Sequence, residues 1–466
     1  MRRAWFVLVL AGACTGCIAA QSRPAARPGA ERPKNIIILI GDGMGYKHIE
    51  AANIWQHGEA DPARPLHLQP YEAFPVRVGV TTYPDGGSYD PAKAWADFQY
   101  VKGGATDSAA AATALATGHK TRNGTLCIDS AGKPLRNIMQ LGEELGKSTG
   151  VVTTVPLSHA TPAGFVAHNP DRGRYAEIAI EMFEKSETDV VFGGGHPLYD
   201  DNGAPKSGGF DYGFVGGEAE WNLLAGGNAG AAVDADHNGK LDDCWALIQT
   251  RAEFQSLAKG TPPHKRVAGV FQAAQTTQHN RQGIDGDRRD DLPYAAPLIQ
   301  TVPTLEEMSR AAINVLDANP RGFFLMIEGG AIDHAGHSNE KGRLIEEMDD
   351  FNAAVKAVAA WVRSNSSWDE TLVIVTADHE TGYLTAGAGI FPDQPLGNNG
   401  PQKLPTMTFN SGGHTNSLVP LFAKGPGARR LLQCAKTDPR RGGYIDNTDI
   451  VRTIEALLAP ADKPSL

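Results

Sequence analysis

Short, continuous apolar runs alternate with helical segments along most of this chain, and this alternation limits the possible fold more than any other feature. Runs such as NIIILI at 35–40 and TLVIVT at 371–376 are typical of strands buried on both faces of a parallel sheet. The expected strands are 35–40, 150–155, 188–192, 323–327, 371–376 and 418–422. The expected helices are 108–117, 175–185, 305–319 and 344–364. The sequence therefore predicts an α/β fold with a mostly parallel central sheet and helices on both faces.

The stretch from about 200 to 291 departs from this alternation. It is rich in Gly, Asp and Asn and shows neither the helical nor the strand period. Such composition is typical of turns and loops. We interpret it as an irregular insertion or cap outside the core of a single domain that extends from 35 to 460.

The charge balance narrows the classes of partner. The chain has 53 acidic and 43 basic residues, a net charge of −10, and no basic block. Proteins that recognise nucleic acid usually present a basic face. The composition therefore argues against a nucleic acid as specific partner.

Residues 1–20 have the pattern of an export signal. Arg2 and Arg3 precede an apolar stretch over 4–13, which is too short to span a bilayer. Small residues follow as far as Ala20, where we expect cleavage. Residues 21–34 are typical of a flexible linker. No later stretch is long enough to cross a membrane, so the protein is expected to be exported, either periplasmic or secreted.

Two features of the cysteines leave alternatives open. Cys17 or Cys14 is an alternative processing point, through which the exported chain would carry a lipid anchor. The mature chain keeps Cys127, Cys244 and Cys434, which allow one intramolecular disulfide at most. This is not a scaffold built on disulfides.

Polar side chains follow the expected strands at the points where the strands end. The carboxyl ends of parallel strands meet at one edge of a sheet, which is where ligands bind in such folds. A dense group of carboxylates and imidazoles there is unstable without cations. Asp and His together suit zinc, whereas carboxylate and threonine oxygens suit magnesium. The residues concerned are Asp42, His159, Thr161, Arg172, Glu328, Asp333, His337, Asp378 and His379, with His414 in the glycine-rich loop SGGHTNS.

Ser108 is the candidate nucleophile. It follows Asp107 at the start of the alanine-rich segment 108–117, so Asp107 or Thr106 is the expected helix cap and Ser108 lies in the first turn. A helix N-terminus offers free N–H groups to a phosphate. No Gly-x-Ser-x-Gly turn surrounds Ser108, so activation by a metal is the better interpretation than a Ser-His-Asp triad.

Six segments, in this order along the chain, resemble the signature motifs of the alkaline phosphatases. Together they extend from Asn35 to about Gly427, which is most of the mature chain. A GDG sequence alone would be weak, but six motifs in order are specific. The segments are IIILIGDGMG, GGATDSAAAATALATG, SHATPAGFVAHNPDR, IEGGAIDHAGH, TADHETG and SGGHTNS.

The resemblance implies a set of roles for the site residues. Ser108 would be phosphorylated and would also face the second zinc, Arg172 would bind phosphate, and Asp107 would orient that arginine. Arg174 is the alternative if the register is shifted. One zinc would be held by Asp333, His337 and His414, the second by Asp42, Asp378 and His379, and one magnesium by Asp42, Thr161 and Glu328.

The resemblance also implies an activity. It is the hydrolysis of phosphate monoesters to an alcohol and inorganic phosphate, through a phosphoserine, with broad specificity, two Zn²⁺ and one Mg²⁺ per chain, and a homodimeric assembly. Two other functions stay open. One is that of a related metal-dependent phosphodiesterase or nucleotide pyrophosphatase. The other is an exported protein that only binds phosphate.

Two histidines lie beside proposed ligands of different metals. His159 is two residues before Thr161, and His334 directly follows Asp333. In the resembling family, a histidine pair at these positions marks one subtype, and we expect this chain to belong to it. A neutral imidazole there avoids the permanent positive charge that a lysine would hold near bound phosphate.

An additional cation site is predicted inside the irregular stretch. Residues 234–243 read DADHNGKLDD, which resembles part of a calcium loop. The twelfth position is Trp245 rather than a glutamate, so the loop is incomplete. The side chains expected to contribute are those of Asp234, Asp236, Asn238 and Asp242, with Gly239 at the turn.

Overall fold

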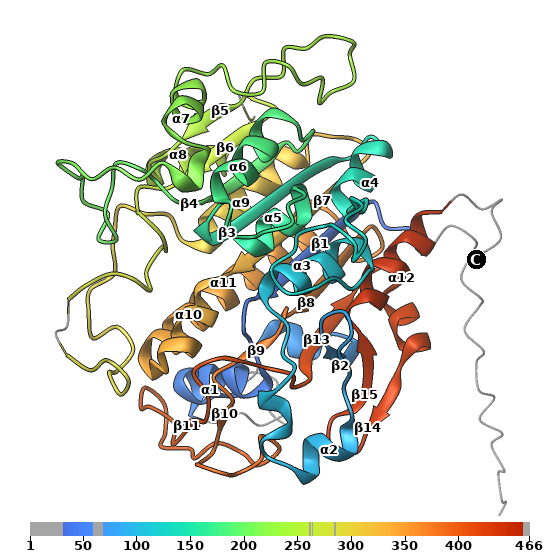
Figure 1. Cartoon of the computed structure of the whole chain (residues 1–466), viewed down its shortest axis with the longest axis vertical. Helices are drawn as coiled ribbons and strands as arrows, with labels where there is room; N and C mark the ends of the chain where they lie inside the picture. Colours follow the sequence, from blue (N-terminus) through green and yellow to red (C-terminus); the bar gives the residue numbers. More distant parts are fainter. Residues whose placement is uncertain (1–30, 59–68, 261, 263, 284–285, 460–466) are drawn as a thin grey trace, which may run out of the picture.

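The central sheet has the predicted character. The computed structural model describes residues 31–58, 69–260, 262, 264–283 and 286–459, so the expected signal peptide and most of the linker lie outside it. Within these residues eleven strands form one sheet (Figure 1). Only β13 and β14 run antiparallel to their neighbours. In spatial order the strands are β14 (Lys436–Asp438), β15 (Gly442–Asp446), β2 (Val76–Thr81), β13 (Val419–Lys424), β8 (Thr371–Thr376), β1 (Asn35–Gly41), β7 (Phe323–Gly329), β3 (Ser148–Pro156), β4 (Val190–Gly194), β6 (Val267–Val270) and β5 (Ala246–Ile248).

Helices cover both faces of the sheet, as the alternation predicts. On one face are α1 (Tyr46–His57), α8 (Arg251–Leu257), α9 (Leu305–Leu316) and α11 (Lys341–Asn365). On the other are α3 (Ser108–Thr117), α4 (Ile138–Glu144), α5 (Ala160–Val166), α6 (Tyr175–Glu184) and α12 (Thr448–Leu458). The remaining helices are α2 (Pro91–Ala96), α7 (Glu218–Ala225) and α10 (Ala331–Ser338).

Consecutive residues of β3 show how such a strand is buried on both faces. The methyl group of Thr149 lies against Gly142 of α4, whereas Gly150 faces Leu316 of α9 on the opposite side. Successive side chains of a strand point to opposite faces, so a strand between two helix layers has no face left for water.

The register of the central strands brings their carboxyl ends to one edge. Ile40 of β1 pairs with Glu328 of β7 on one side and with Thr376 of β8 on the other. Glu328 also pairs with Thr153 of β3. The residues that follow these four parallel strands therefore emerge side by side.

The interpretation of residues 200–291 is wrong in part. Most of this range is irregular, but it contributes the parallel strands β5 and β6 to the sheet and α8 to one face. Phe254 and Phe271 from this range are fully buried in the main core. The strands contain only three and four residues, which is too short for a period to emerge from the glycine-rich background.

Among the residues that the structure describes, no helix combines the length with the hydropathy that a membrane span requires.

The three cysteines of the expected mature chain form no disulfide in this structure. Cys127, Cys244 and Cys434 are free thiols, and the Sγ of Cys127 donates a hydrogen bond to the carbonyl oxygen of Gly164.

The buried part of the 200–291 range gives a stability prediction. Phe254→Ala should lower the free energy of unfolding by about 3–5 kcal/mol, because it removes a fully buried ring that packs on Phe192. Leu241→Ala is the matched control from the same range. Its side chain is 66% exposed, so a change within about 0.5 kcal/mol is expected. Urea unfolding measures both, and equal small effects would mean that α8 is not part of the core.

Candidate active site

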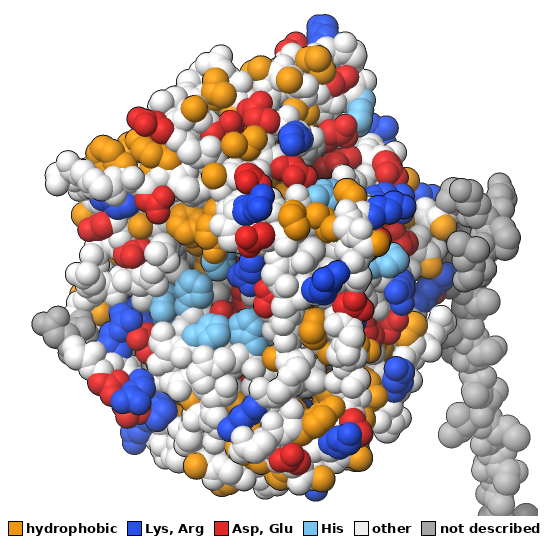
Figure 2. Space-filling view, in the orientation of Figure 1, with side chains coloured by type: hydrophobic (Ala, Val, Ile, Leu, Met, Phe, Trp, Pro, Cys, Tyr) orange, Lys and Arg blue, Asp and Glu red, His pale blue; other side chains and the backbone are white. Residues whose placement is uncertain are grey.

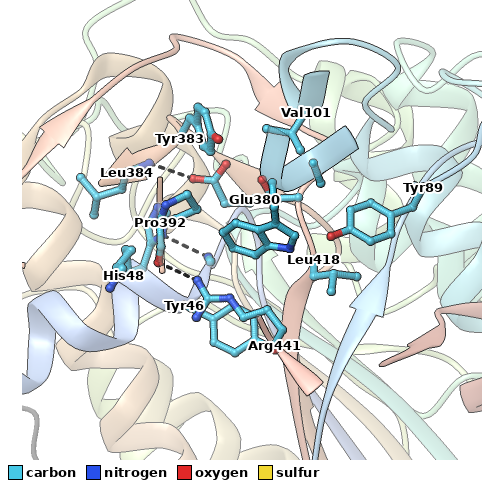
Figure 3. A pocket seen from close by; sticks show the side chains of 15 residues that line it. Tyr46, His48, Tyr89, Val101, Glu380, Tyr383, Leu384, Pro392, Leu418 and Arg441 are labelled. Atoms are coloured by element: carbon cyan, nitrogen blue, oxygen red, sulfur yellow. Dashed lines mark hydrogen bonds between the residues drawn. The ribbon is translucent and has the colours of Figure 1, made fainter. Parts of the chain in front are cut away.

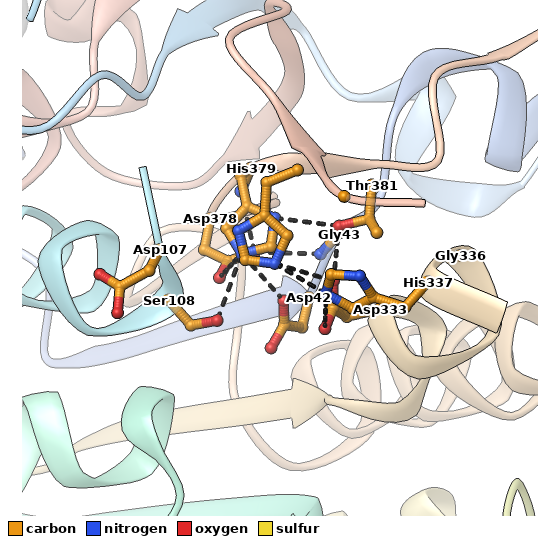
Figure 4. Close-up of polar contacts among 12 residues, drawn as sticks. Asp42, Gly43, Asp107, Ser108, Asp333, Gly336, His337, Asp378, His379 and Thr381 are labelled. Carbon is orange, nitrogen blue, oxygen red and sulfur yellow. Dashed lines mark hydrogen bonds and ion pairs between the residues drawn. The ribbon is translucent and has the colours of Figure 1, made fainter. Parts of the chain in front are cut away.

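The six predicted zinc ligands lie together at the carboxyl edge of the sheet. Figure 4 labels all of them except His414. The turn after β1 provides one, the turn after β8 provides two, and α10, which follows β7, provides two at successive turns. The last lies on β12 (His414–Thr415), which pairs with β9 (Glu380–Thr381). These residues are Asp42, Asp333, His337, Asp378, His379 and His414.

The first group is centred on Asp333. Nε2 of His337 lies 3.3 Å from Asp333 Oδ2, and Nε2 of His414 lies 3.4 Å from Asp333 Oδ1. The two Nε2 atoms are 3.0 Å apart. Their Nδ1 atoms donate to the carbonyl oxygens of Gly412 and Thr106, which fixes the ring orientation and directs Nε2 towards Asp333.

The second group is centred on His379. Its Nε2 lies 3.1 Å from Asp378 Oδ2 and 3.4 Å from Asp42 Oδ1. Asp378 and His379 lie in the turn beyond β8, as the sequence requires if both are to face one site. The other oxygen of Asp378 accepts the amide of Gly43, which has a φ of 74°. A Cβ at Gly43 would lie 2.8 Å from Thr381 Oγ1, so only glycine fits this turn.

A third group lies on the other side of Asp42. It consists of Thr161, from the first turn of α5, and Glu328, the sixth residue of β7. Glu328 accepts a hydrogen bond from Thr153 on the neighbouring strand. Within the described residues, one buried side-chain oxygen each of Asp42, Thr161 and Glu328 has no hydrogen-bond partner. Buried oxygens without donors are what a cation site requires.

Without cations, the site holds more buried carboxylates than positive groups to neutralise them. Burial and then the neighbouring Asp378 raise the pKa of Asp42 well above its usual range, and burial raises the pKa of Glu328 to about 7. Burial also acts to raise the pKa of Asp333, but hydrogen bonds from His337 and His414 outweigh it and hold that pKa well below the usual range. The donor set of oxygens and imidazoles fits divalent cations in all three groups.

Ser108 faces the second group. It is the first residue of α3, and Asp107 caps the helix by accepting the amide of Ala110 at 3.0 Å. The Oγ of Ser108 lies 3.2 Å from Nε2 of His379. The hydroxyl thus lies at a helix N-terminus, where a phosphate is favoured, and beside two carboxylates of the second group.

Asp107 also orients the predicted arginine. Its Oδ2 accepts a hydrogen bond from Arg172 Nη1 at 3.1 Å and another from the amide of Gly124. The alternative, Arg174, pairs instead with Glu177 at 3.3 Å and is half exposed. The geometry therefore favours Arg172 over Arg174.

The two histidines beside the third group contact each other. The rings of His159 and His334 are 6.0 Å apart at an angle of 67°. His159 also stacks on Tyr175, with ring centroids 5.8 Å apart. Burial lowers the pKa of His159 to about 3 and that of His334 to about 4, so both rings are neutral at physiological pH.

Thr381 connects the first two groups, and the sequence analysis missed it. Its Oγ1 lies 2.5 Å from Asp333 Oδ1 and 3.2 Å from His379 Nδ1. It thus donates to a carboxylate of one group and accepts from an imidazole of the other. The signal was present, because Thr381 follows His379 by two residues within the quoted motif TADHETG.

A small cavity lies behind this site but does not include it (Figure 3). Tyr46, Trp95, Tyr383 and Arg441 are among its lining residues, and none of the predicted ligands lines it. Its volume is about 30 Å³. The predicted site instead opens to the surface, where Figure 2 shows histidine side chains gathered in the middle of the face.

The predicted calcium loop is arranged differently from the expectation. Asp234 and Asp236 approach Asp243 rather than Asp242. The oxygens of Asp234 accept the amides of Asn238 and Gly239, and Asp236 pairs with Lys265 at 2.6 Å. The contribution of Asp242, like calcium at this loop, stays a prediction, and Asp243 is a further carboxylate close to Asp234 and Asp236.

Comparison with known proteins identifies the family. The alkaline phosphatase family model matches residues 33–409. Alkaline phosphatase 3 of Bacillus subtilis is 30% identical over 370 residues, which cover 77% of this chain and 63% of the relative. Alkaline phosphatase H of Pseudomonas aeruginosa is 28% identical, over 92% of this chain and 86% of the relative. The chain therefore belongs to the alkaline phosphatase family, and it spans about 63% of the length of the Bacillus proteins.

Solved structures support the same fold. A cold-active alkaline phosphatase from a psychrophilic Shewanella species is 25% identical, with a TM-score of 0.64, over 91% of this chain and all of that one. A mutant of the TAB5 alkaline phosphatase, solved with Mg bound in its M3 site, is 23% identical, with a TM-score of 0.60, over 92% of this chain and 98% of that one.

Metal removal gives a pH prediction. The hydrogen bond that His337 donates to Asp333 raises the pKa of this imidazole to about 9, so the metal-free ring is protonated below that pH. A metal ion must displace this proton. The apparent affinity of the chelator-stripped protein for Zn²⁺ should therefore rise with pH up to about 9 and then level off. Competition with a coloured chelator between about pH 7 and pH 10 measures this.

Asp333→Asn is the control for that titration. Without the carboxylate, His337 should titrate near its ordinary pKa of about 6.5, so the rise should move to lower pH. Zinc affinity that does not change with pH in the wild type would contradict the role given to the Asp333–His337 pair.

Proposed function

We propose that the protein hydrolyses phosphate monoesters to an alcohol and inorganic phosphate through a covalent phosphoserine at Ser108. The observation that carries the proposal is the position of this hydroxyl. The hydroxyl lies at the N-terminus of α3, 3.2 Å from the imidazole of His379 in the second group. Asp107, which caps the same helix, also accepts a hydrogen bond from Arg172. Membership of the alkaline phosphatase family supports the same activity.

Each part of the site has a separate role in the proposed reaction. Two Zn²⁺ and one Mg²⁺ in the three groups would supply charge stabilisation for the serine oxygen and the leaving oxygen, and an activated water for the second step. Ser108 attacks phosphorus in line. Arg172, held by Asp107, binds two phosphoryl oxygens with its planar fork. The amides at the start of α3 add hydrogen-bond donors for the phosphate.

The phosphodiesterase alternative is weaker on two observations. Thr161 and Glu328 leave buried oxygens for a third cation, which related two-metal enzymes do not need. Arg172 faces the site as a fork suited to a phosphate with two free oxygens. A protein that only binds phosphate would not require a hydroxyl directed at His379.

We also propose the histidine-pair form of the third site. His159 and His334 are neutral and in contact, so neither holds a permanent charge near the product. Weak product inhibition, an alkaline optimum and activation by magnesium follow from this. Broad specificity is expected for an open phosphate site. Export, lipid attachment and pairing of two copies stay predictions.

The function is tested by the choice of substrate. The enzyme, supplied with Zn²⁺ and Mg²⁺, should hydrolyse p-nitrophenyl phosphate and should prefer it to bis(p-nitrophenyl) phosphate. A preference for the diester would overturn the monoester assignment in favour of the phosphodiesterase. No turnover of either ester would leave only a binding function.

The nucleophile is tested separately. Ser108→Ala should keep the fold and the metals, since a small residue fits the first turn of a helix, but it should lose the phosphoenzyme and reduce turnover on the order of a thousandfold or more. Ser309→Ala, at a buried serine of α9, is the control and should keep both. Mass spectrometry of the acid-quenched enzyme decides, and phosphate on another residue would show that the assignment is wrong.

The histidine pair is tested by a change of charge. His334→Lys places an ammonium beside the bound product, so phosphate inhibition should become severalfold tighter and turnover slower at alkaline pH. His264→Lys, at an exposed histidine, should change neither. Inhibition constants measured across pH provide the comparison. Equal values for wild type and His334→Lys would mean that this position does not tune the site.

A further inference from the structure

His279 reaches the proposed active site from the 200–291 range, although no motif singled it out. Its ring lies 5.6 Å from that of His334, edge to face at 82°. On its other side His334 contacts His159 at 6.0 Å. The His334 ring is therefore in contact with two imidazoles, one from the motif-rich core and one from the irregular range.

His279 is buried and faces an oxygen at each ring nitrogen. Only 5% of the residue is exposed. Its Nδ1 lies 2.9 Å from Asn280 Oδ1, within a hydrogen bond. Its Nε2 lies 3.3 Å from the carboxylate oxygen Oε2 of Glu340, although these two atoms do not form a hydrogen bond. Glu340 also pairs with Arg288, at 2.8 Å, so this carboxylate is itself fixed.

Glu340 connects His279 to the helix pair that carries the site. It is the N-cap residue of α11 and lies two residues after the end of α10, on which Asp333 and His334 lie. The range around His279 is therefore attached to the same corner of the chain as the residue that His279 contacts.

A second, buried ion pair keeps this range in place. Arg281, which is 1% exposed, pairs with Glu346 of α11 at 2.7 Å. Its guanidinium also donates to the carbonyl oxygens of Pro297 and Ala296, so the chain that follows His279 is anchored. A buried charge network of this kind fixes geometry even where its net contribution to stability is small.

We infer that His279 is a positioning residue for His334: by holding that ring against the third group, it sets how firmly inorganic phosphate binds. The inference rests on the proposed function of the site. An imidazole beside a metal site depends on its outer contacts for orientation. If His334 acts by setting the affinity for phosphate, loss of its contact with His279 should raise KM with little change in kcat. His279 acts through His334 and does not itself touch the reacting atoms.

The test compares three variants as holoenzymes loaded with zinc and magnesium. His279→Ala removes the ring, His279→Phe restores an aromatic edge without its polar atoms, and His196→Ala is the matched control. His196 is a buried histidine of the same part of the chain, 1% exposed and packed against Tyr199 and Trp221. Calorimetry with inorganic phosphate, KM and kcat for p-nitrophenyl phosphate, and metal content are measured for each.

The expected pattern separates positioning from a general loss of stability. In His279→Ala the Kd for phosphate and the KM should both rise about threefold to tenfold, with kcat changed less than about twofold and metal content unchanged. His279→Phe should stay within about twofold of wild type. His196→Ala should lower the melting temperature without moving the Kd.

Two outcomes would overturn the inference. One is an unchanged phosphate Kd in His279→Ala, and the other is an equal rise in His196→Ala, which would indicate general loosening. If His279→Ala does not fold, His279→Phe and Glu340→Gln are compared instead. His279→Phe keeps the aromatic edge, whereas Glu340→Gln removes the charge that faces His279 Nε2. A phosphate Kd that rises equally in both variants would exclude the ring contact as the cause. A wild type that binds phosphate but hydrolyses no monoester would refute the proposed function instead, because calorimetry does not depend on turnover.

Discussion

Mutual repulsion among buried carboxylates is the constraint on which the rest of this molecule depends. Asp42, Glu328, Asp333 and Asp378 are all buried at the carboxyl edge of four parallel strands. The same register that gives the sheet its core brings them together, since Ile40, Glu328 and Thr376 are paired neighbours. The protein's own imidazoles compensate only part of this charge. The fold therefore creates a need for divalent cations, and the catalytic proposal follows from that need.

The fold could be predicted to a large extent because its strands are buried on both faces. NIIILI and TLVIVT have no polar face, and only a parallel sheet between helix layers accommodates such runs. The site could be predicted because its residues directly follow those strands. The absence of a Gly-x-Ser-x-Gly turn and the position of Ser108 favour metal activation over a catalytic triad. The geometry of Arg172 resolved an alternative that spacing alone left open.

What could not be predicted depends on contacts between distant segments. His279 contacts a partner 55 residues away, His334, and no period or motif spacing reports such a contact. The short strand β6 was not predicted for a similar reason, since it is buried by pairing with β4 and by packing against Phe254 of α8. The irregular range is thus part of the core at one end and part of the active-site wall at the other.

Anomalous X-ray diffraction at the zinc edge, from crystals of the protein purified with zinc and magnesium, tests the central claim most directly. The account predicts two zinc peaks, one among Asp333, His337 and His414 and one among Asp42, Asp378 and His379, with a lighter cation beside Thr161 and Glu328. Crystals from fully metal-supplemented protein that show no anomalous peak within these groups would contradict it.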